Sequence, residues 1–306
     1  MRELIAERRD AWPPLPLDSW KDTYATLHMW MQVVGKIRLK LAPYVNHWWQ
    51  VPFYVTARGL TTSAMPYQGH AVAIDFDFLD HQLVIQTSAG DTRRLALRPQ
   101  TVAAFHDQTR KALAELGVQV DIWTMPVEIE APIRFELDEI HATYDPDAAQ
   151  RAWRVLLASN AVFNEFRGRF LGKSSPVHFF WGSFDLAVTR FSGRRCPQPP
   201  PDPIGREGYS HEVISVGFWP GGRGVDAVYY AYAAPPPAGF DAAKVQPDAA
   251  YYHATLGEFL LPYEAVCTSS SPRDALLAFC QSTYDAGATL GDWDRASLEQ
   301  SSPPAW

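Results

Sequence analysis

Cysteine is scarce. The 306-residue chain has three, an odd number and too few for a disulfide framework, which favours a reducing cytoplasm. Charged residues make up only 20% of the chain, and 27 Lys and Arg against 34 Asp and Glu give a formal net charge of −7. This balance argues against a nucleic-acid partner and against a polybasic contact with a membrane. No run of about 18 or more apolar residues occurs, so we expect no transmembrane helix, and the N-terminus lacks the apolar core of a secretion signal.

The motifs that identify common enzymes are missing as well. The chain contains no GxGxxG, GxxxxGK[ST], GxSxG, HExxH or CxxC pattern and no EF-hand loop. The glycine-rich stretch PGGRG at 220–224 lies between two predicted strands with no helix after it, so it predicts a hairpin turn and not a phosphate site. The sequence therefore names no cofactor and no reaction.

Apolar residues are plentiful, at 47% of the chain, and 13% is aromatic, which is enough for a full core. Asp18 predicts the cap of a helix that Pro43 ends, and Pro99 predicts the start of another that ends at Gly117. Asp145 predicts a third cap. The pattern divides the chain into an N-terminal arm (1–17), a first α+β unit (18–117), an extended connector (118–146), a second α+β unit (147–296) with a Pro-rich loop (195–209) and a tail (297–306).

The second unit repeats the first in order and in residues. NHWWQVPFYVTARGL aligns with HFFWGSFDLAVTRFS, which pairs Arg58 with Arg190, and GHAVAIDFDF aligns with SHEVISVGFW, which pairs His70 with His211. FHDQTRKALAELG aligns in the same way with FCQSTYDAGATLG near the end of each unit. Three stretches in one order indicate an internal duplication. We predict an α+β fold of two pseudo-repeated helix–antiparallel sheet–helix units packed together.

The densest polar content falls on two aromatic strands of the second unit. If residues 178–185 form one strand, alternation places His178 and Asp185 on opposite faces, although a bulge would mix them. Buried polar groups need partners. The candidate catalytic residues are His178, His211, Glu212 and Asp185, and the candidate substrate-binding residues are Arg190, Arg194, Arg58, Trp181 and Tyr230.

Several functions fit these residues. A His with a carboxylate can move a proton, and His178, His211 and Glu212 can instead ligate a divalent metal. Both versions predict a cytosolic enzyme acting on a small anionic or aromatic molecule, in a pocket lined mainly by the second unit, with arginines gripping the anion. The alternatives are a non-catalytic small-molecule binding protein with an aromatic cleft, or a structural protein that forms homo-oligomers. The alternative to any functional role is that these residues are satisfied polar pairs that pin the interface between the two halves. The Pro-rich loop can be a lid or a plain insertion.

Four stretches carry a resemblance to a known family. They are HWWQVPFYVTARGLTTS, SSPVHFFWGSFDLAVTRFSGR, SHEVISVGFWPGG and STYDAGATLGDWD. With them the chain, from about Leu15 to Asp294, resembles an uncharacterised bacterial family that is known only as a domain of unknown function. The resemblance implies a bacterial cytosolic protein and implies neither an activity nor catalytic residues.

Overall fold

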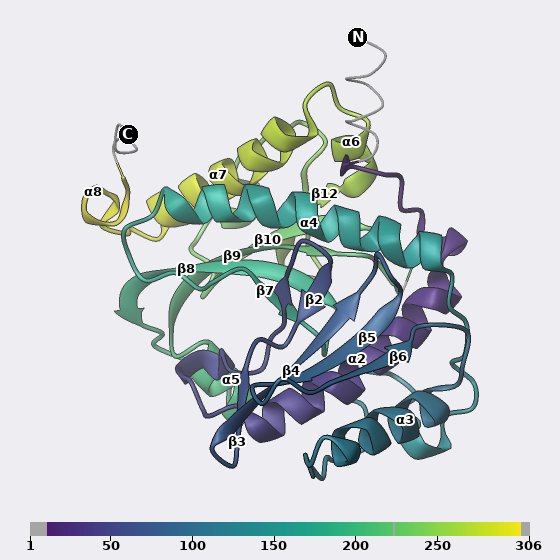
Figure 1. Ribbon diagram of the computed structural model, residues 1–306. Coiled ribbons are helices and arrows are strands. Elements are labelled where there is room, and N and C mark those ends of the chain that lie inside the picture. The colour runs from purple at the N-terminus through teal and green to yellow at the C-terminus, as the bar shows by residue number, and fades with distance from the viewer. Residues whose placement is uncertain (1–10, 223, 301–306) are drawn as a thin grey trace, which may run out of the picture.

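A computed structural model describes residues 11–222 and 224–300. Helices and two antiparallel sheets of six strands each make up this part of the chain, which confirms the predicted α+β class (Figure 1). Within the described ranges, every helix is too short or too polar to span a bilayer.

Along the chain, the strands of the first sheet come after one long helix and before another. After α2 (Lys21–Leu41) and the short 3-10 helix η2 (Asn46–Trp48), the strands run in the order β1-β2-β4-β5-β6, with β3 beside β4. Their bounds are β1 (Tyr54–Val55), β2 (Gly59–Thr61), β3 (Met65–Tyr67), β4 (His70–Asp77), β5 (Gln82–Thr87) and β6 (Thr92–Ala96), followed by α3 (Val102–Glu115).

The second sheet has the order β11-β12-β10-β9-β8-β7 and follows α4 (Pro146–Gly168). Its strands are β7 (His178–Phe180), β8 (Asp185–Arg195), β9 (His211–Trp219), β10 (Val228–Ala234), β11 (Tyr251–His253) and β12 (Glu258–Pro262). The helices of this part are α5 (Pro203–Gly208), α6 (Tyr263–Cys267), α7 (Pro272–Leu290) and α8 (Arg295–Leu298), and the remaining 3-10 helices are η1 (Leu17–Ser19), η3 (Phe135–Leu137) and η4 (Phe240–Ala242).

The two units share one topology, as a duplication requires. Each has a long helix, five strands that pair in chain order and a second long helix, while the sixth strand is placed differently: β3 pairs with β4, and β11 pairs with β12 at the edge of its sheet. The register corrects one detail of the sequence alignment. Leu60 lies opposite Phe76, and Ala187 lies opposite Gly217. Aligning His70 with His211 pairs Phe76 with Gly217 and hence Leu60 with Ala187, so Arg58 corresponds to Asp185. The pairing of Arg58 with Arg190 is therefore wrong in this register.

The helix starts show how far local signals reach. Asp145 accepts hydrogen bonds from the backbone N–H groups of residues 147 and 148 and caps α4, as predicted. Asp18 caps nothing: it lies in η1, and Trp20 precedes α2 without a side-chain cap. Thr101 caps α3, which begins three residues after Pro99. The aromatic stretch after Val45 does not form one strand but η2 followed by two short strands, because His47 and Trp48 are left-handed, with φ of 61° and 60°.

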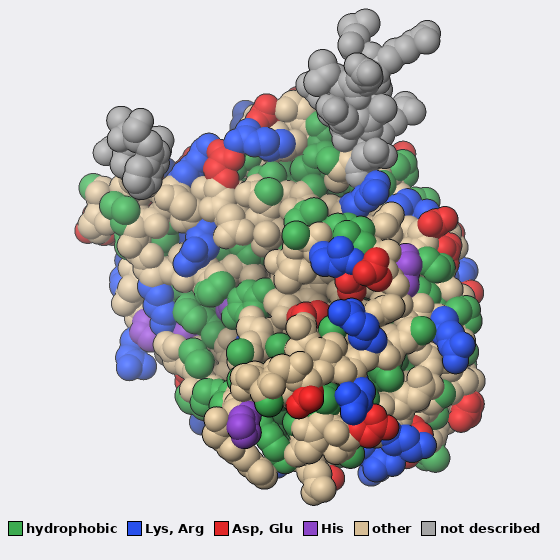
Figure 2. Space-filling view, in the orientation of Figure 1, with side chains coloured by type: hydrophobic (Ala, Val, Ile, Leu, Met, Phe, Trp, Pro, Cys, Tyr) green, Lys and Arg blue, Asp and Glu red, His purple; other side chains and the backbone are tan. Residues whose placement is uncertain are grey.

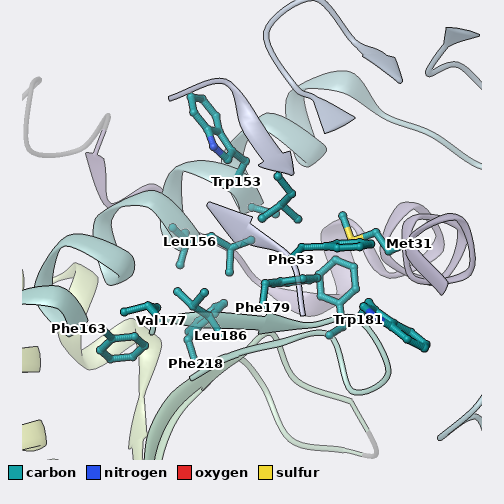
Figure 3. Close-up of a cluster of buried hydrophobic side chains, with 14 of the residues drawn as sticks. Met31, Phe53, Trp153, Leu156, Phe163, Val177, Phe179, Trp181, Leu186 and Phe218 are labelled. Atoms are coloured by element: carbon teal, nitrogen blue, oxygen red, sulfur yellow. The ribbon is translucent and has the colours of Figure 1, made fainter. Parts of the chain in front are cut away.

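A narrow seam joins the two sheets. The backbones of Phe53 and Phe179 exchange two hydrogen bonds of 2.9 Å, and their rings stack with centroids 6.4 Å apart. Figure 3 shows these rings beside Trp181 and Met31, between the sheets and α2. The Trp181 indole N–H donates to the Val51 carbonyl at 2.8 Å. The ring lies where Gly35 leaves α2 without a side chain, since a Cβ on Gly35 would stand 2.2 Å from it.

Both described ends of the chain pack on the second unit. Trp12 and Leu15 of the arm are buried, and the Tyr263 hydroxyl donates to the Pro13 carbonyl at 2.8 Å. At the other end, Leu171 N–H donates to the Leu298 carbonyl at 2.7 Å. The expected tail at 301–306 lies outside the described residues, as do the first ten residues of the arm.

We predict that Gly35→Ala destabilises the protein, although alanine normally favours a helix over glycine. The added methyl would overlap the Trp181 ring, which lowers the free energy of unfolding by about 1–3 kcal/mol. Gly168→Ala is the matched control, because its Cβ would meet no atom within 4 Å. Urea denaturation measures both variants, and equal stability of the two would show that Trp181 is not seated on α2 at this position.

Candidate functional site

One face of the second sheet is packed against α4 and α7, and the other face is the candidate site. Tyr229 points to α4, where its hydroxyl lies 2.9 Å from the Ser159 hydroxyl. The residues on either side of it in β10 therefore point away from the helices. We call this second surface the open face, by which we mean only that it points away from α4 and α7; its residues are buried or half-buried. It carries His178, Asp185, Ala187, Thr189, Ser215, Gly217, Tyr230 and Tyr232.

His178 and Asp185 lie on the same face, so their predicted separation on opposite faces is wrong. Residues 181–184 form a turn, which makes 178–195 a hairpin of β7 and β8 and not one strand. His178 lies opposite Ala187, and Phe180 lies opposite Asp185. The turn bends at Phe184, which has a φ of 59°. This conformation is unfavourable for a bulky residue, but Gly182 and Ser183 in the same turn are common turn residues, and this signal was missed when 178–185 was interpreted as one strand.

His178 is buried among aromatic rings. It is 1% exposed, and neither ring nitrogen has a hydrogen-bond partner. The rings of Trp49 and Tyr54 lie 5.8 and 5.6 Å away, edge to face. Burial, with a contribution from the Arg38 charge, lowers the His178 pKa to about 3. At neutral pH this imidazole is therefore uncharged.

His178 and His211 do not form a pair. His178 pairs with Ala187 of β8, which pairs in turn with Gly217 of β9. His211 lies six residues before Gly217 on β9, which is roughly 20 Å of strand. The rings of Trp49 and His47 lie between them. Glu212 accepts from the Ser192 hydroxyl at 2.9 Å and pairs with Arg194. The predicted metal set is thus not assembled, and nowhere in 11–222 or 224–300 do three His, Cys, Asp or Glu side chains form a group that could hold a metal ion.

The three candidate arginines are engaged elsewhere. Arg190 is 1% exposed on the helix face, with its guanidinium 3.5 Å from the centre of the Phe166 ring, and burial lowers its pKa to about 10. Arg194 donates to the Asp292 carbonyl at 3.0 Å and to that of Gly291, just after α7. Arg58 pairs with Asp77 and Asp80 at 2.7 Å each. Trp181 is the seam residue described above. These contacts hold structure together and leave no group directed at a ligand on the open face.

A first polar cluster lies at one end of the open face. The hydroxyls of Ser183 and Tyr230 both donate to the Asp185 carboxylate. Burial raises the pKa of Asp185 despite these two donors, which lower it. Burial and then the Asp185 charge raise the pKa of Glu258 to about 7 and also raise that of Glu128. Of the candidates predicted from the sequence, the structure brings together Asp185 and Tyr230. The two acids near them, Glu258 and Glu128, were not predicted.

A second polar cluster lies at the other end, where the first unit meets the second. We call it the His47 cluster; it consists of His47, Lys173, Glu207 and His211. Lys173 Nζ lies 2.6 Å from His47 Nε2, and His47 Nδ1 lies 3.0 Å from the Glu207 carbonyl oxygen. A carbonyl only accepts, so Nδ1 carries the hydrogen and Nε2 presents a lone pair to the ammonium. The His211 ring lies 5.9 Å from that of His47.

Charge in the His47 cluster is unevenly matched. Burial, followed by the Lys173 charge, lowers the His47 pKa, and the same two causes with Arg195 lower that of His211. Burial also lowers the Lys173 pKa, which Glu207 partly offsets. The backbone N–H of His47 donates to Glu207 and holds its pKa down. One carboxylate therefore faces several groups that are, or can become, positive. Figure 2 shows histidine side chains next to Lys and Arg at the ends of β8 and β9.

The backbone under this cluster is strained and braced. Two consecutive left-handed residues, His47 and Trp48, cost about 1–3 kcal/mol each. The brace is α5 of the Pro-rich loop, because Glu207 Oε1 accepts from His47 N–H at 3.0 Å. The helix α5 of this loop therefore packs against η2, and Figure 1 shows where α5 lies. Strain held in place by a distant segment is typical of functional sites.

Sequence reasoning missed three of the four residues of this cluster. The signal for His47 was its place just before Trp48 and Trp49, in a stretch where the second unit carries different polar groups. Lys173 and Glu207 gave no signal, because they lie 126 and 160 residues away in a loop and in the Pro-rich segment.

The fold and the site define a class: an α+β protein with a duplicated helix–sheet–helix unit and a basic, histidine-containing cluster where the copies meet. The chain belongs to the family of unknown function DUF5996, whose model matches residues 12–300. No curated protein and no solved structure matches the chain. The family covers nearly the whole described chain, as the resemblance of the sequence predicts.

We predict that stability falls as the solution is acidified. The folded-state pKa is about 3 for His178 and, again through burial, about 4 for His28, both below the ordinary 6.5. The unfolded chain binds protons below pH 6.5 and the folded one does not, so stability present at pH 7.5 is lost toward pH 4. Each histidine contributes up to about 1.4 kcal/mol per pH unit.

Urea denaturation between pH 7.5 and 4.5 measures this slope. His178→Phe should flatten it while leaving stability at pH 7.5 unchanged or higher, since the ring nitrogens have no partner to lose. A variant with the wild-type slope would mean that His178 is not held neutral by burial.

Proposed function

We propose that this protein is an enzyme that transfers a proton to or from a small anionic molecule at the His47 cluster. The observation that carries the proposal is the arrangement of His47, whose Nδ1 is fixed by the Glu207 carbonyl while Nε2 faces Lys173 at 2.6 Å. An oriented imidazole with a lowered pKa is a suitable general base at neutral pH. The second unit supplies three of the four side chains.

In this proposal the cluster binds the substrate through charge. Lys173 and the nearby Arg195 attract a carboxylate or phosphate group by charge, and Glu207 is the acid of the cluster that opposes them. His211, whose lowered pKa keeps it neutral at neutral pH, donates a hydrogen bond to the same group. When Lys173 turns to the anion, it releases His47 Nε2, which then accepts the substrate proton. The rings of Trp49 and Phe191, 5.3 and 5.0 Å from Lys173 Nζ, confine the ammonium.

Each residue has a role in this scheme. His47 is the base, Lys173 and His211 bind the anion, and Glu207 is a positioning residue because it acts through the backbone and ring of His47. The cytoplasm is the location we propose, and the three free cysteines, Cys196, Cys267 and Cys280, support it.

The test uses the full chain and a mixture of small carboxylates and phosphate esters in deuterated buffer. Proton NMR follows which compound exchanges a proton or is converted. We expect His47→Asn to slow this reaction by about 100-fold or more, the usual contribution of general acid–base catalysis. Asparagine tolerates the left-handed backbone of position 47, so the loop should keep its shape.

Two further variants complete the experiment. Lys173→Met should raise KM more than it lowers kcat, because it removes the anion-binding charge. Lys21→Met is the control and should behave as wild type, because this side chain is 60% exposed and pairs with Asp18 of η1. An unchanged rate in His47→Asn, or no reaction with any compound of the mixture, contradicts the proposal.

A further inference from the structure

The short helix α5 covers the base of the proposed reaction but buries none of its own residues. His47 is 6% exposed, although Lys173 beside it is exposed. α5 packs against η2, which carries His47, and yet no residue of α5 is buried, with Ile204 at 66% exposed. A segment without buried apolar side chains gains little from the hydrophobic effect, so it can separate from the rest of the protein at low cost.

The contacts that hold α5 on η2 converge on one residue. Glu207 accepts the backbone N–H of His47 in its carboxylate and the Nδ1–H of the His47 ring in its backbone carbonyl, both at 3.0 Å. The hydroxyl of Tyr44, a residue that is 60% exposed, forms a further hydrogen bond with the carboxylate. Water can replace polar contacts of this kind when the helix moves away. Glu207 therefore decides whether α5 stays closed.

The loop around α5 has a stiff arm, a fixed base and a glycine between the helix and the base. The segment 197–203 contains five prolines, which stiffen it, and Asp202 caps α5. At the base, Cys196 N–H donates to the Ser210 carbonyl at 3.1 Å, which ties the loop to the ends of β8 and β9. Gly208 ends α5, and a Cβ there would meet no atom within 4 Å, so this position can act as a hinge.

The backbone under α5 gains from its departure. His47 and Trp48 are held in left-handed conformations, and Glu207 braces the first of them. When α5 leaves, this pair can relax, which offsets part of the contacts that are lost. Closed and open arrangements are therefore close in free energy, as a moving element requires.

We propose that α5 is a lid over the His47 cluster, which opens at Gly208 to admit the substrate and closes to orient His47 through Glu207. The inference rests on the proposed function, because a base that is 6% exposed must be uncovered before a substrate can reach it. Attraction of the anion begins at the exposed Lys173. Closure then restores the hydrogen bond that fixes the His47 ring, and it keeps water from the site.

The rate at which diethyl pyrocarbonate modifies His47, followed by peptide mass spectrometry, measures opening. The reagent acylates neutral imidazole, and burial favours the neutral form of His47 by lowering its pKa. In the full wild-type chain at neutral pH we expect His47 to react about tenfold or more slowly than the exposed His70, because it reacts only when α5 is open.

Three variants of the contacts on α5 should change this rate in order. Tyr44→Phe removes one hydrogen bond to the carboxylate and should speed the modification of His47 by about 3- to 10-fold. Glu207→Ala removes all contacts of the carboxylate and should speed it by about tenfold or more. Glu207→Gln keeps a side-chain oxygen that accepts the His47 N–H, so its rate should stay within about threefold of wild type.

The controls separate opening of the lid from other effects. Tyr251→Phe makes the same substitution as Tyr44→Phe on β11, at the edge of the sheet opposite β7, and should leave the rate unchanged. His178 and His28, which are 1% and 8% exposed, should stay unmodified in every variant, which excludes general unfolding. Lys173 is unchanged throughout, so its contact with the His47 ring does not explain a difference between variants.

Two results would overturn the lid: equal rates for His47 and His70 in the wild-type protein, or a wild-type rate for His47 in Glu207→Ala. Either would show that α5 does not control access to the ring. Because the labelling needs no turnover, failure of the lid is read separately from failure of the proposed reaction in the NMR experiment.

Discussion

The reciprocal backbone pairing of Phe53 with Phe179 is the interaction on which the rest of the molecule depends. It joins the residue just before β1 of one copy to β7, the first strand of the other, and the stacked rings exclude water from it. The Trp181 indole extends this seam onto α2, where only a glycine leaves room. The segment before β1 packs on β8, where the rings of His47 and Phe191 lie 4.8 Å apart, and there His47 meets Lys173.

Burial decides the chemistry of the open face. The same desolvation that makes His178 a neutral ring raises the pKa of Asp185 and lowers that of His47. At one end hydroxyls satisfy the carboxylate, so that cluster is closed on itself. At the other end basic groups outnumber the one acid, and that cluster retains capacity for an anion. The two ends of one sheet face are thus suited to different tasks.

The copies keep a scaffold and differ in their polar groups. The position of Arg58 in one is that of Asp185 in the other, and Thr283 bonds its own helix where Thr109 does not. Packing positions must fit the same neighbours in both copies, whereas a polar position is free to change once its partner changes. This is why a site in one unit has no counterpart at the equivalent place in the other.

The sequence by itself determined the α+β class, the order of helices and hairpins, the Asp145 cap and the duplication, because these follow from periodicity and from contacts a few residues apart. The left-handed pair His47 and Trp48 could not be predicted, since these residues disfavour that conformation. The β7–β8 turn did carry a signal, Gly182 with Ser183, which the interpretation as one strand missed. Only the tertiary structure decided which candidates meet. Lys173 and Glu207 reach His47 across 126 and 160 residues, and local spacing carries no information about such partners.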